Sequence, residues 1–205
     1  MTKVFIGGSR RISKLNKAIK DRIDNIIQNE YTVLVGDANG ADKAVQNYLF
    51  DKKYKNVLVF CMGDKCRNNI GSWQTKSIKA SGSIKASGSK KDFSYYSIKD
   101  LEMARAADYG FMIWDAKSNG TLNNIVNLLK ENKKTLLYFS PEGSYYTLIT
   151  IDNLEELLAK CDRKYLDVFE EKLKISSILK KEDKRRTSNL SKGQLGPLFD
   201  YVSPS

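Results

Sequence analysis

The sequence predicts an α/β fold, a Rossmann-like parallel sheet of about five strands with helices on both faces, plus a C-terminal strand and long-helix extension. Three observations support this prediction. Short apolar runs alternate with segments whose apolar residues recur at helical spacing. Each unusual loop follows one of these short runs. The chain has 205 residues, of which 41% are apolar, enough for one sizeable core.

The alternation determines where a ligand would bind. Because βαβ crossovers are right-handed and parallel strands end at one edge of the sheet, we expect the ligand crevice at the carboxyl ends of the strands. Strands are predicted over residues 3–6, 32–35, 57–60, 109–114 and 135–139, and helices over 14–28, 41–50, 96–107 and 121–129.

We expect three parts along the chain. Residues 1–140 form the Rossmann-like domain. Residues 141–180 form an extension, with a strand over 145–150 and one helix from Asp152 through about Leu179. Residues 181–205 are expected to form a basic, flexible tail.

Residues 61–95 form a long basic loop between a predicted strand and helix, too long for a plain connection. Within it, residues 77–82 (Ser-Ile-Lys-Ala-Ser-Gly) recur unchanged as residues 83–88. A site that tolerates such a copy is typical of an exposed, lid-like loop.

The charge of the chain indicates anionic partners. Lys and Arg number 35 against 24 Asp and Glu, a net charge of +11. Most of the excess lies in segments 65–99 and 172–192, which favours phosphates, nucleotides or nucleic acid as partners. For segment 172–192 a solvated tail is the alternative.

The composition excludes several chemistries. The chain has no histidine, which removes Ser-His-Asp and Cys-His mechanisms and His-ligated metals. The three cysteines, Cys61, Cys66 and Cys161, are odd in number and follow no secretion signal, so we expect free thiols, no metal and no cofactor. Without an apolar run of about 18–20 residues, no membrane span is expected and a cytoplasmic location is predicted.

The first motif is Gly7, Gly8, Ser9 and Arg10, directly after the first strand. Glycines let a ligand approach the backbone, and free amides with a hydroxyl and a guanidinium can hold a phosphate. A plain turn is the alternative for this motif.

The second motif follows the second strand and contains Gly36, Asp37, Asn39, Gly40 and Asp42. Its two carboxylates are acceptors suited to ribose hydroxyls or to an amino group. For Asp42 the alternative is a helix-start residue favoured by the helix dipole.

The third motif follows the fourth strand and contains Trp114, Asp115, Ser118, Gly120 and Thr121. Gly120 and Thr121 begin a predicted helix, so their amides can face an anion. Trp114 is a candidate ligand contact, with a core aromatic residue as the alternative.

Together the three motifs resemble the SLOG superfamily, the Rossmann-like group that includes DprA and the LOG cytokinin-activating phosphoribohydrolases. The YspA-like branch is the most similar, because its pattern W-D-G-K-S-x-G-T nearly matches residues 114–121. Its loop tryptophan followed by Lys-x-Ala-Gly is similar to Trp73 and residues 79–82. The resemblance covers about residues 3–139.

The resemblance implies that residues 1–140 bind a nucleotide between these loops, and several members of the superfamily cleave N-glycosidic bonds. The carboxylate that LOG proteins hold near the ribose corresponds to Asn124, which can bind a hydroxyl but cannot act as a base. Asp100, which replaces an asparagine of the related pattern, and Asp115 are the candidate catalytic residues. A solvated helix residue is the alternative for Asp100.

Three functions remain open. The chain is expected to bind a nucleotide or nucleotide derivative and to cleave its N-glycosidic or phosphoribosyl bond. The alternative is a non-catalytic sensor or sequestering protein for such a molecule. The third is DprA-like nucleic-acid binding through segments 65–99 and 172–192. The resemblance also implies a homo-oligomer, because proteins of this superfamily often self-associate.

Overall fold

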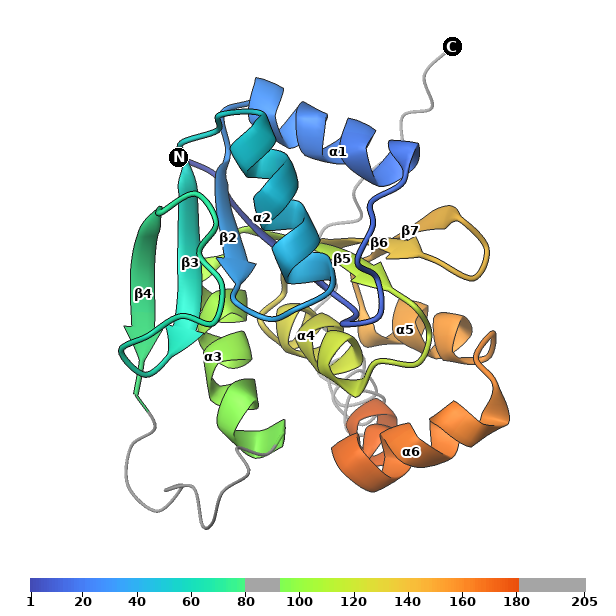
Figure 1. Cartoon of the computed structure of the whole chain (residues 1–205). Coiled ribbons are helices and arrows are strands. Elements are labelled where there is room, and N and C mark those ends of the chain that lie inside the picture. The colour runs from blue at the N-terminus through green and yellow to red at the C-terminus, as the bar shows by residue number, and fades with distance from the viewer. Residues whose placement is uncertain (80–92, 181–205) are drawn as a thin grey trace, which may run out of the picture.

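The computed structural model describes residues 1–79 and 93–180, which form one sheet flanked by helices (Figure 1). The sheet has seven strands in the order β4-β3-β2-β1-β5-β6-β7. All neighbouring strands are parallel except β7, which pairs antiparallel with β6. The strands are β1 (Lys3–Gly8), β2 (Thr32–Gly36), β3 (Val57–Met62), β4 (Gln74–Ile78), β5 (Tyr109–Trp114), β6 (Thr135–Phe139) and β7 (Ser144–Leu148); the helices are α1 (Lys17–Gln28), α2 (Ala41–Asp51), α3 (Phe93–Ala106), α4 (Asn119–Lys130), α5 (Ile151–Leu158) and α6 (Arg163–Leu173).

This architecture confirms the predicted α/β class with helices on both faces of a Rossmann-like sheet. Helices α1 and α2 cover one face, and α3 to α6 cover the other (Figure 1). The side-chain alternation of β1 shows how the sequence separates the faces, since Phe5 packs toward α3 and α4 while Val4 and Ile6 pack toward α1 and α2. The near-continuous apolar strands therefore supply two cores.

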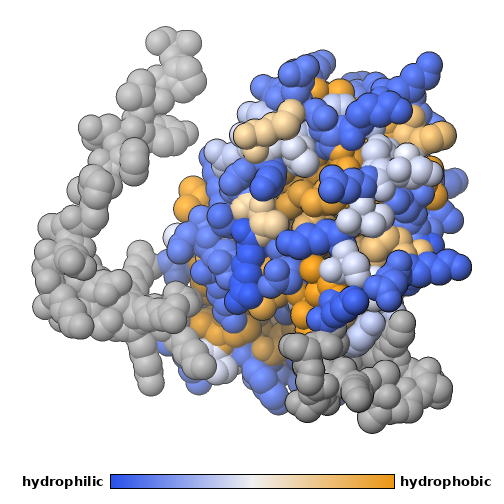
Figure 2. All heavy atoms as spheres, turned by 90° about the vertical axis from the view of Figure 1, so that its left-hand side faces the viewer, coloured by the Kyte–Doolittle hydropathy of each residue, from blue (hydrophilic) through white to orange (hydrophobic). Residues whose placement is uncertain are grey.

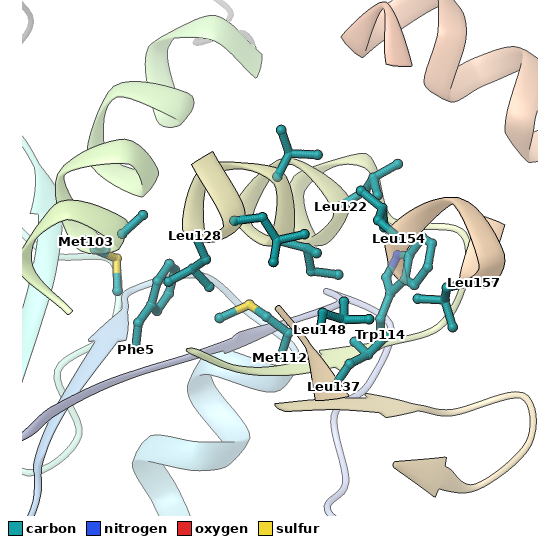
Figure 3. Close-up of a cluster of buried hydrophobic side chains, with 14 of the residues drawn as sticks. Phe5, Met103, Met112, Trp114, Leu122, Leu128, Leu137, Leu148, Leu154 and Leu157 are labelled. Carbon is teal, nitrogen blue, oxygen red and sulfur yellow. The ribbon is translucent and has the colours of Figure 1, made fainter. Parts of the chain in front are cut away.

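The C-terminal extension packs on the end of the sheet and shares its core. Trp114 ends β5. Its ring centroid lies 5.9 Å from that of Phe139 and 5.8 Å from that of Phe169 in α6. Leu154 and Leu157 of α5 lie beside Trp114 (Figure 3). Trp114 is fully buried here, and its indole N–H donates to the Ser118 carbonyl oxygen at 3.1 Å.

Two predicted elements differ from the structure. The loop expected at 61–95 contains β4, an edge strand that the alternation missed because four of its five side chains are exposed and polar. Its side of the molecule is mainly hydrophilic, with apolar patches between the polar side chains (Figure 2). The single helix expected from Asp152 is instead interrupted between α5 and α6 and again at Lys174, whose φ is 54°. Thr150, not Asp152, is its N-cap.

The expectation of free thiols is wrong for two of the three cysteines. Cys61 and Cys66 form a disulfide, with 5.1 Å between their Cα atoms. The turn after β3 folds Cys66 back onto the strand end, a proximity that cysteine counting could not detect. Cys161 is a free thiol, and burial raises its pKa to about 11.

Some predictions fall outside the described residues. These are the tail, 181–205, and residues 80–88, which make up most of the tandem repeat. Within the described part of the chain, no helix is long and apolar enough to cross a membrane.

Candidate ligand-binding site at the strand ends

Ser9 joins the three motif loops at the carboxyl ends of the central strands. It is fully buried. Its N–H donates to the Ile113 carbonyl oxygen at 2.9 Å, and its own carbonyl oxygen accepts from the Ala41 N–H at 3.2 Å. Its hydroxyl donates to Asp115 Oδ1 at 2.8 Å and lies 3.3 Å from the Thr121 hydroxyl. Ser9 therefore acts as a connector rather than a ligand contact.

Two glycines permit this convergence. A Cβ on Gly8 would lie 2.8 Å from the Cβ of Ala41 and 2.9 Å from that of Ile113. Gly40 precedes α2 with a φ of +82°, and a Cβ there would clash with the backbone of Arg10. The first and second loops are thus in direct contact only because both positions lack a side chain.

The loops and helix α3 enclose a cavity of about 320 Å³. This volume lies at the small end of the ~300–1,000 Å³ range of small-molecule sites. The cavity is lined by eight of the predicted site residues, namely Gly8, Arg10, Asp42, Asp100, Ser118, Gly120, Thr121 and Asn124, and by five others, Ala38, Arg67, Tyr96, Lys99 and Asn119.

Lys99 on α3 provides a buried positive charge at the cavity wall. Its side chain is only 4% exposed, and its Nζ lies 3.1 Å from Asp100 Oδ1 and 4.0 Å from Asp37 Oδ1. Burial works to lower the pKa of Lys99, but the charges of Asp100, Asp42 and Asp37 outweigh burial and raise it. Lys99 is therefore held in its charged form.

Gly36 leaves room for this cluster at the end of β2. A Cβ on Gly36 would clash with the carboxylate of Asp42 and would lie 2.9 Å from Lys99 Nζ. The glycine is thus required by the ion cluster rather than by a ligand.

Asp37 anchors the loop that follows β3. Its carboxylate accepts from the Arg67 backbone N–H at 3.0 Å and from the guanidinium Nε at 3.1 Å and Nη2 at 2.6 Å. Burial tends to raise the pKa of Asp37, but these bonds and the charge of Lys99 lower it below its usual value. The side-chain oxygen of Asn39, in the loop after β2, accepts from the side-chain amide of Asn68, in the loop after β3, at 3.1 Å.

Asp42 is the buried carboxyl whose titration is most altered. Burial raises its pKa to about 6, although the charge of Lys99 acts in the opposite direction. Its Oδ2 accepts from the Ala38 N–H at 3.3 Å. A carboxyl that lines a cavity and titrates near neutral pH can exchange a proton with a bound molecule.

Tyr96 forms the aromatic side of the cavity. Its ring lies against the guanidinium of Arg67, at 4.4 Å from the ring centroid, and near that of Arg10, at 5.8 Å. The two guanidinium groups and the ring make a surface that suits a planar, anionic molecule.

The first turn of α4 forms another part of the cavity wall. Ser118 is the N-cap, and its hydroxyl accepts from the Thr121 N–H at 3.3 Å. The amides of Asn119 and Gly120, which precede Thr121, lack an intrahelical acceptor by position. Both residues line the cavity, so this turn can donate to an anion.

Of the two carboxylates predicted to be catalytic, only Asp100 lines the cavity. Asn124, with its amide nitrogen turned toward Asp100, donates to Asp100 Oδ2 and to the Gly120 carbonyl oxygen at 3.2 Å each. Asp115 instead holds the loop after β5, since its Oδ1 accepts from the N–H groups of Lys117 at 3.0 Å and Ser118 at 2.9 Å.

The two predicted tryptophans lie away from the cavity. Trp114 is in the core. Trp73 packs with the core of α1 and α2, and its indole N–H donates to the Tyr54 carbonyl oxygen at 2.9 Å. Gly7 lies beside the site, where an added Cβ would be 3.6 Å from the side-chain amide group of Asn124.

The sequence did not indicate Arg67, Tyr96 or Lys99 as residues of the nucleotide site; they were expected only as part of the basic segment 65–99. Lys99 precedes Met103 by four residues on a helix whose Met103 and Ala104 are fully buried. A lysine on a buried helical face is the one signal that was available. Arg67 and Asp37 are 30 residues apart in the chain, so no local sequence pattern could indicate their contact.

The site as described belongs to an α/β protein with a Rossmann-like parallel sheet. No model of a known protein family matches the chain, and no similar sequence was found among the curated proteins. Within residues 1–79 and 93–180, no group of three or more His, Cys, Asp or Glu side chains is arranged so that it could hold a metal ion.

The raised pKa of Asp42 predicts how stability depends on pH. A carboxyl with a folded pKa of about 6 and an ordinary value of 3.8 binds its proton more tightly in the folded state. The contribution of Asp42 to the free energy of unfolding is therefore present at low pH and is lost as pH rises through 6. We expect the wild-type free energy of unfolding to fall by about 1 kcal/mol between pH 5 and 7.5, as measured by urea denaturation.

Asp42→Asn should remove this slope, and the absence of histidine leaves few other groups that titrate there. Asp24→Asn serves as the control, because Asp24 lies outside the cluster in contact with Tyr48. Equal slopes in the wild type and Asp42→Asn would contradict the assignment.

Proposed function

We propose that the chain binds a nucleotide or nucleotide derivative in the cavity at the strand ends. The observation that carries the proposal is the convergence on one cavity of the first turn of α4, the guanidinium of Arg10 and the carboxylate of Asp100. Amides and a guanidinium match a phosphate, and a carboxylate matches ribose hydroxyls. The cavity volume suits a single mononucleotide.

The charges inside the cavity support a ligand with both anionic and hydroxyl groups. Lys99 is engaged by Asp100 and Asp37, so its charge is largely balanced within the protein. Arg10 and the α4 amides are the groups we assign to the phosphate. Asp100 and Asn124, already in contact with each other, are assigned to the sugar.

Cleavage of the N-glycosidic bond is a second step that Asp42 and Asp100 favour. The pKa of Asp42 is raised to about 6, which suits proton transfer at neutral pH. Asp100 is in contact with Asn124, and we assign both residues to the sugar. Asp100 is therefore the carboxylate that we expect closest to the bond to be cleaved. Without turnover, the same groups would make a binding site for a sensor or sequestering protein.

The basic segments offer less support for nucleic-acid binding. In segment 65–99, Arg67 is paired with Asp37 and Lys99 with Asp100. Residues 80–92 of this segment and residues 181–192 of the second lie outside the described part of the chain. DprA-like binding therefore stays a prediction from the sequence.

Adenosine 5′-monophosphate is the first probe for binding. We expect binding by isothermal titration calorimetry that weakens about tenfold in Arg10→Ala, because a charge-assisted contact to the phosphate is lost. Arg22→Ala is the matched control, since Arg22 lines a separate cavity with Val4 and Tyr31 at the start of the neighbouring strands. If neither this probe nor a panel including NAD and cyclic nucleotides binds, the proposal is wrong.

Catalysis is tested by incubating the same nucleotides with the protein and separating the products by chromatography. We expect release of free base by the wild type and a loss of at least about 100-fold in Asp100→Asn, the size typical of a general acid–base residue. Intact nucleotide recovered after tight binding would instead establish the sensor or sequestering function.

A further inference from the structure

The disulfide between Cys61 and Cys66 lies next to a wall of the cavity. Cys61 is the second-last residue of β3, and Cys66, in the loop after that strand, directly precedes Arg67. Arg67 donates its backbone N–H and two guanidinium N–H groups to Asp37, and its guanidinium lies against Tyr96. The disulfide therefore fixes the residue adjacent to a cationic group of the site.

From this placement we propose that the Cys61–Cys66 disulfide is a redox-sensitive site that controls ligand binding by holding Arg67 against Asp37. The proposal rests on the nucleotide-binding function proposed above. A dithiol is the expected reductant of the disulfide. Reduction would change the cavity by releasing Arg67 from its fixed position.

Contacts on either side limit which residues would respond. Before the disulfide, Gly63 is bound to β4 through the Ile78 carbonyl oxygen at 2.9 Å and the Ser77 hydroxyl at 2.8 Å. After it, the Asn68 side chain donates to the Asp37 carbonyl oxygen at 2.8 Å. The additional freedom after reduction is thus confined to residues 64–67, where the Arg67 guanidinium is partly exposed.

The two sulfurs differ in their access to a reductant. Cys61 is 1% exposed, whereas Cys66 is only partly buried. A thiolate of the dithiol attacks Cys66 Sγ, the protein S–S bond breaks, and Cys61 leaves as a thiolate that takes up a proton. The second thiol of the dithiol then displaces Cys66, which takes up a proton, and the dithiol becomes a disulfide.

The test compares the full chain before and after treatment with dithiothreitol. Thiol titration should find one thiol, that of Cys161, before treatment and all three cysteines after it. Reduction should speed hydrogen exchange at the Arg67 amide and weaken adenosine 5′-monophosphate binding about fivefold, through lost preorganisation. Cys66→Ser should behave as the reduced protein under both conditions.

Cys161→Ser is the matched control, because it removes a thiol far from the disulfide and should keep the full redox response. Three thiols in the untreated, air-exposed protein would overturn the proposal. Unchanged exchange at Arg67, or faster exchange with unchanged nucleotide affinity, would also overturn it. If the nucleotide binds neither form, the proposed function fails, while amide exchange still decides whether the disulfide holds Arg67.

Discussion

The ammonium group of Lys99 lies among three carboxylates at the carboxyl end of the sheet, and the site depends on this arrangement. Asp37, Asp42 and Asp100 would repel one another in a buried setting without a cation between them. Lys99 lies 3.1 Å from Asp100 and 4.0 Å from Asp37, and its charge acts on all three. Losing one partner of such a buried cluster typically costs about 3–5 kcal/mol, because the remaining charges stay unpaired.

From this cluster the contacts extend in two directions. Asp37 reaches outward to Arg67 and so positions a guanidinium beside Tyr96. Asp100 reaches across the cavity to Asn124 on α4. Ser9 joins the loops behind the cavity through the backbone of β5 and α2. The polar groups of the cavity are thus held by other polar groups, which leaves Arg10 and the first turn of α4 as the groups best placed to meet a ligand.

The sequence predicted the fold and the location of the site better than the roles of single residues. Periodicity located the central strands, because buried parallel strands are continuously apolar, but it missed β4, which is polar and exposed. Spacing placed Gly8 and Gly40 in converging loops. It could not show that Ser9 and Asp115 serve as connectors, that Trp73 and Trp114 are core residues, or that Arg67 meets Asp37, since these contacts join residues far apart in the chain.

We propose that a sugar-phosphate fits between the first turn of α4 and the carboxylates around Lys99. A crystal structure of the protein grown with adenosine 5′-monophosphate tests it most directly. We expect the phosphate on the amides of Asn119 and Gly120 near Arg10, with the ribose against Asp100. A nucleotide bound elsewhere on the protein, or a phosphate turned away from α4, would contradict it.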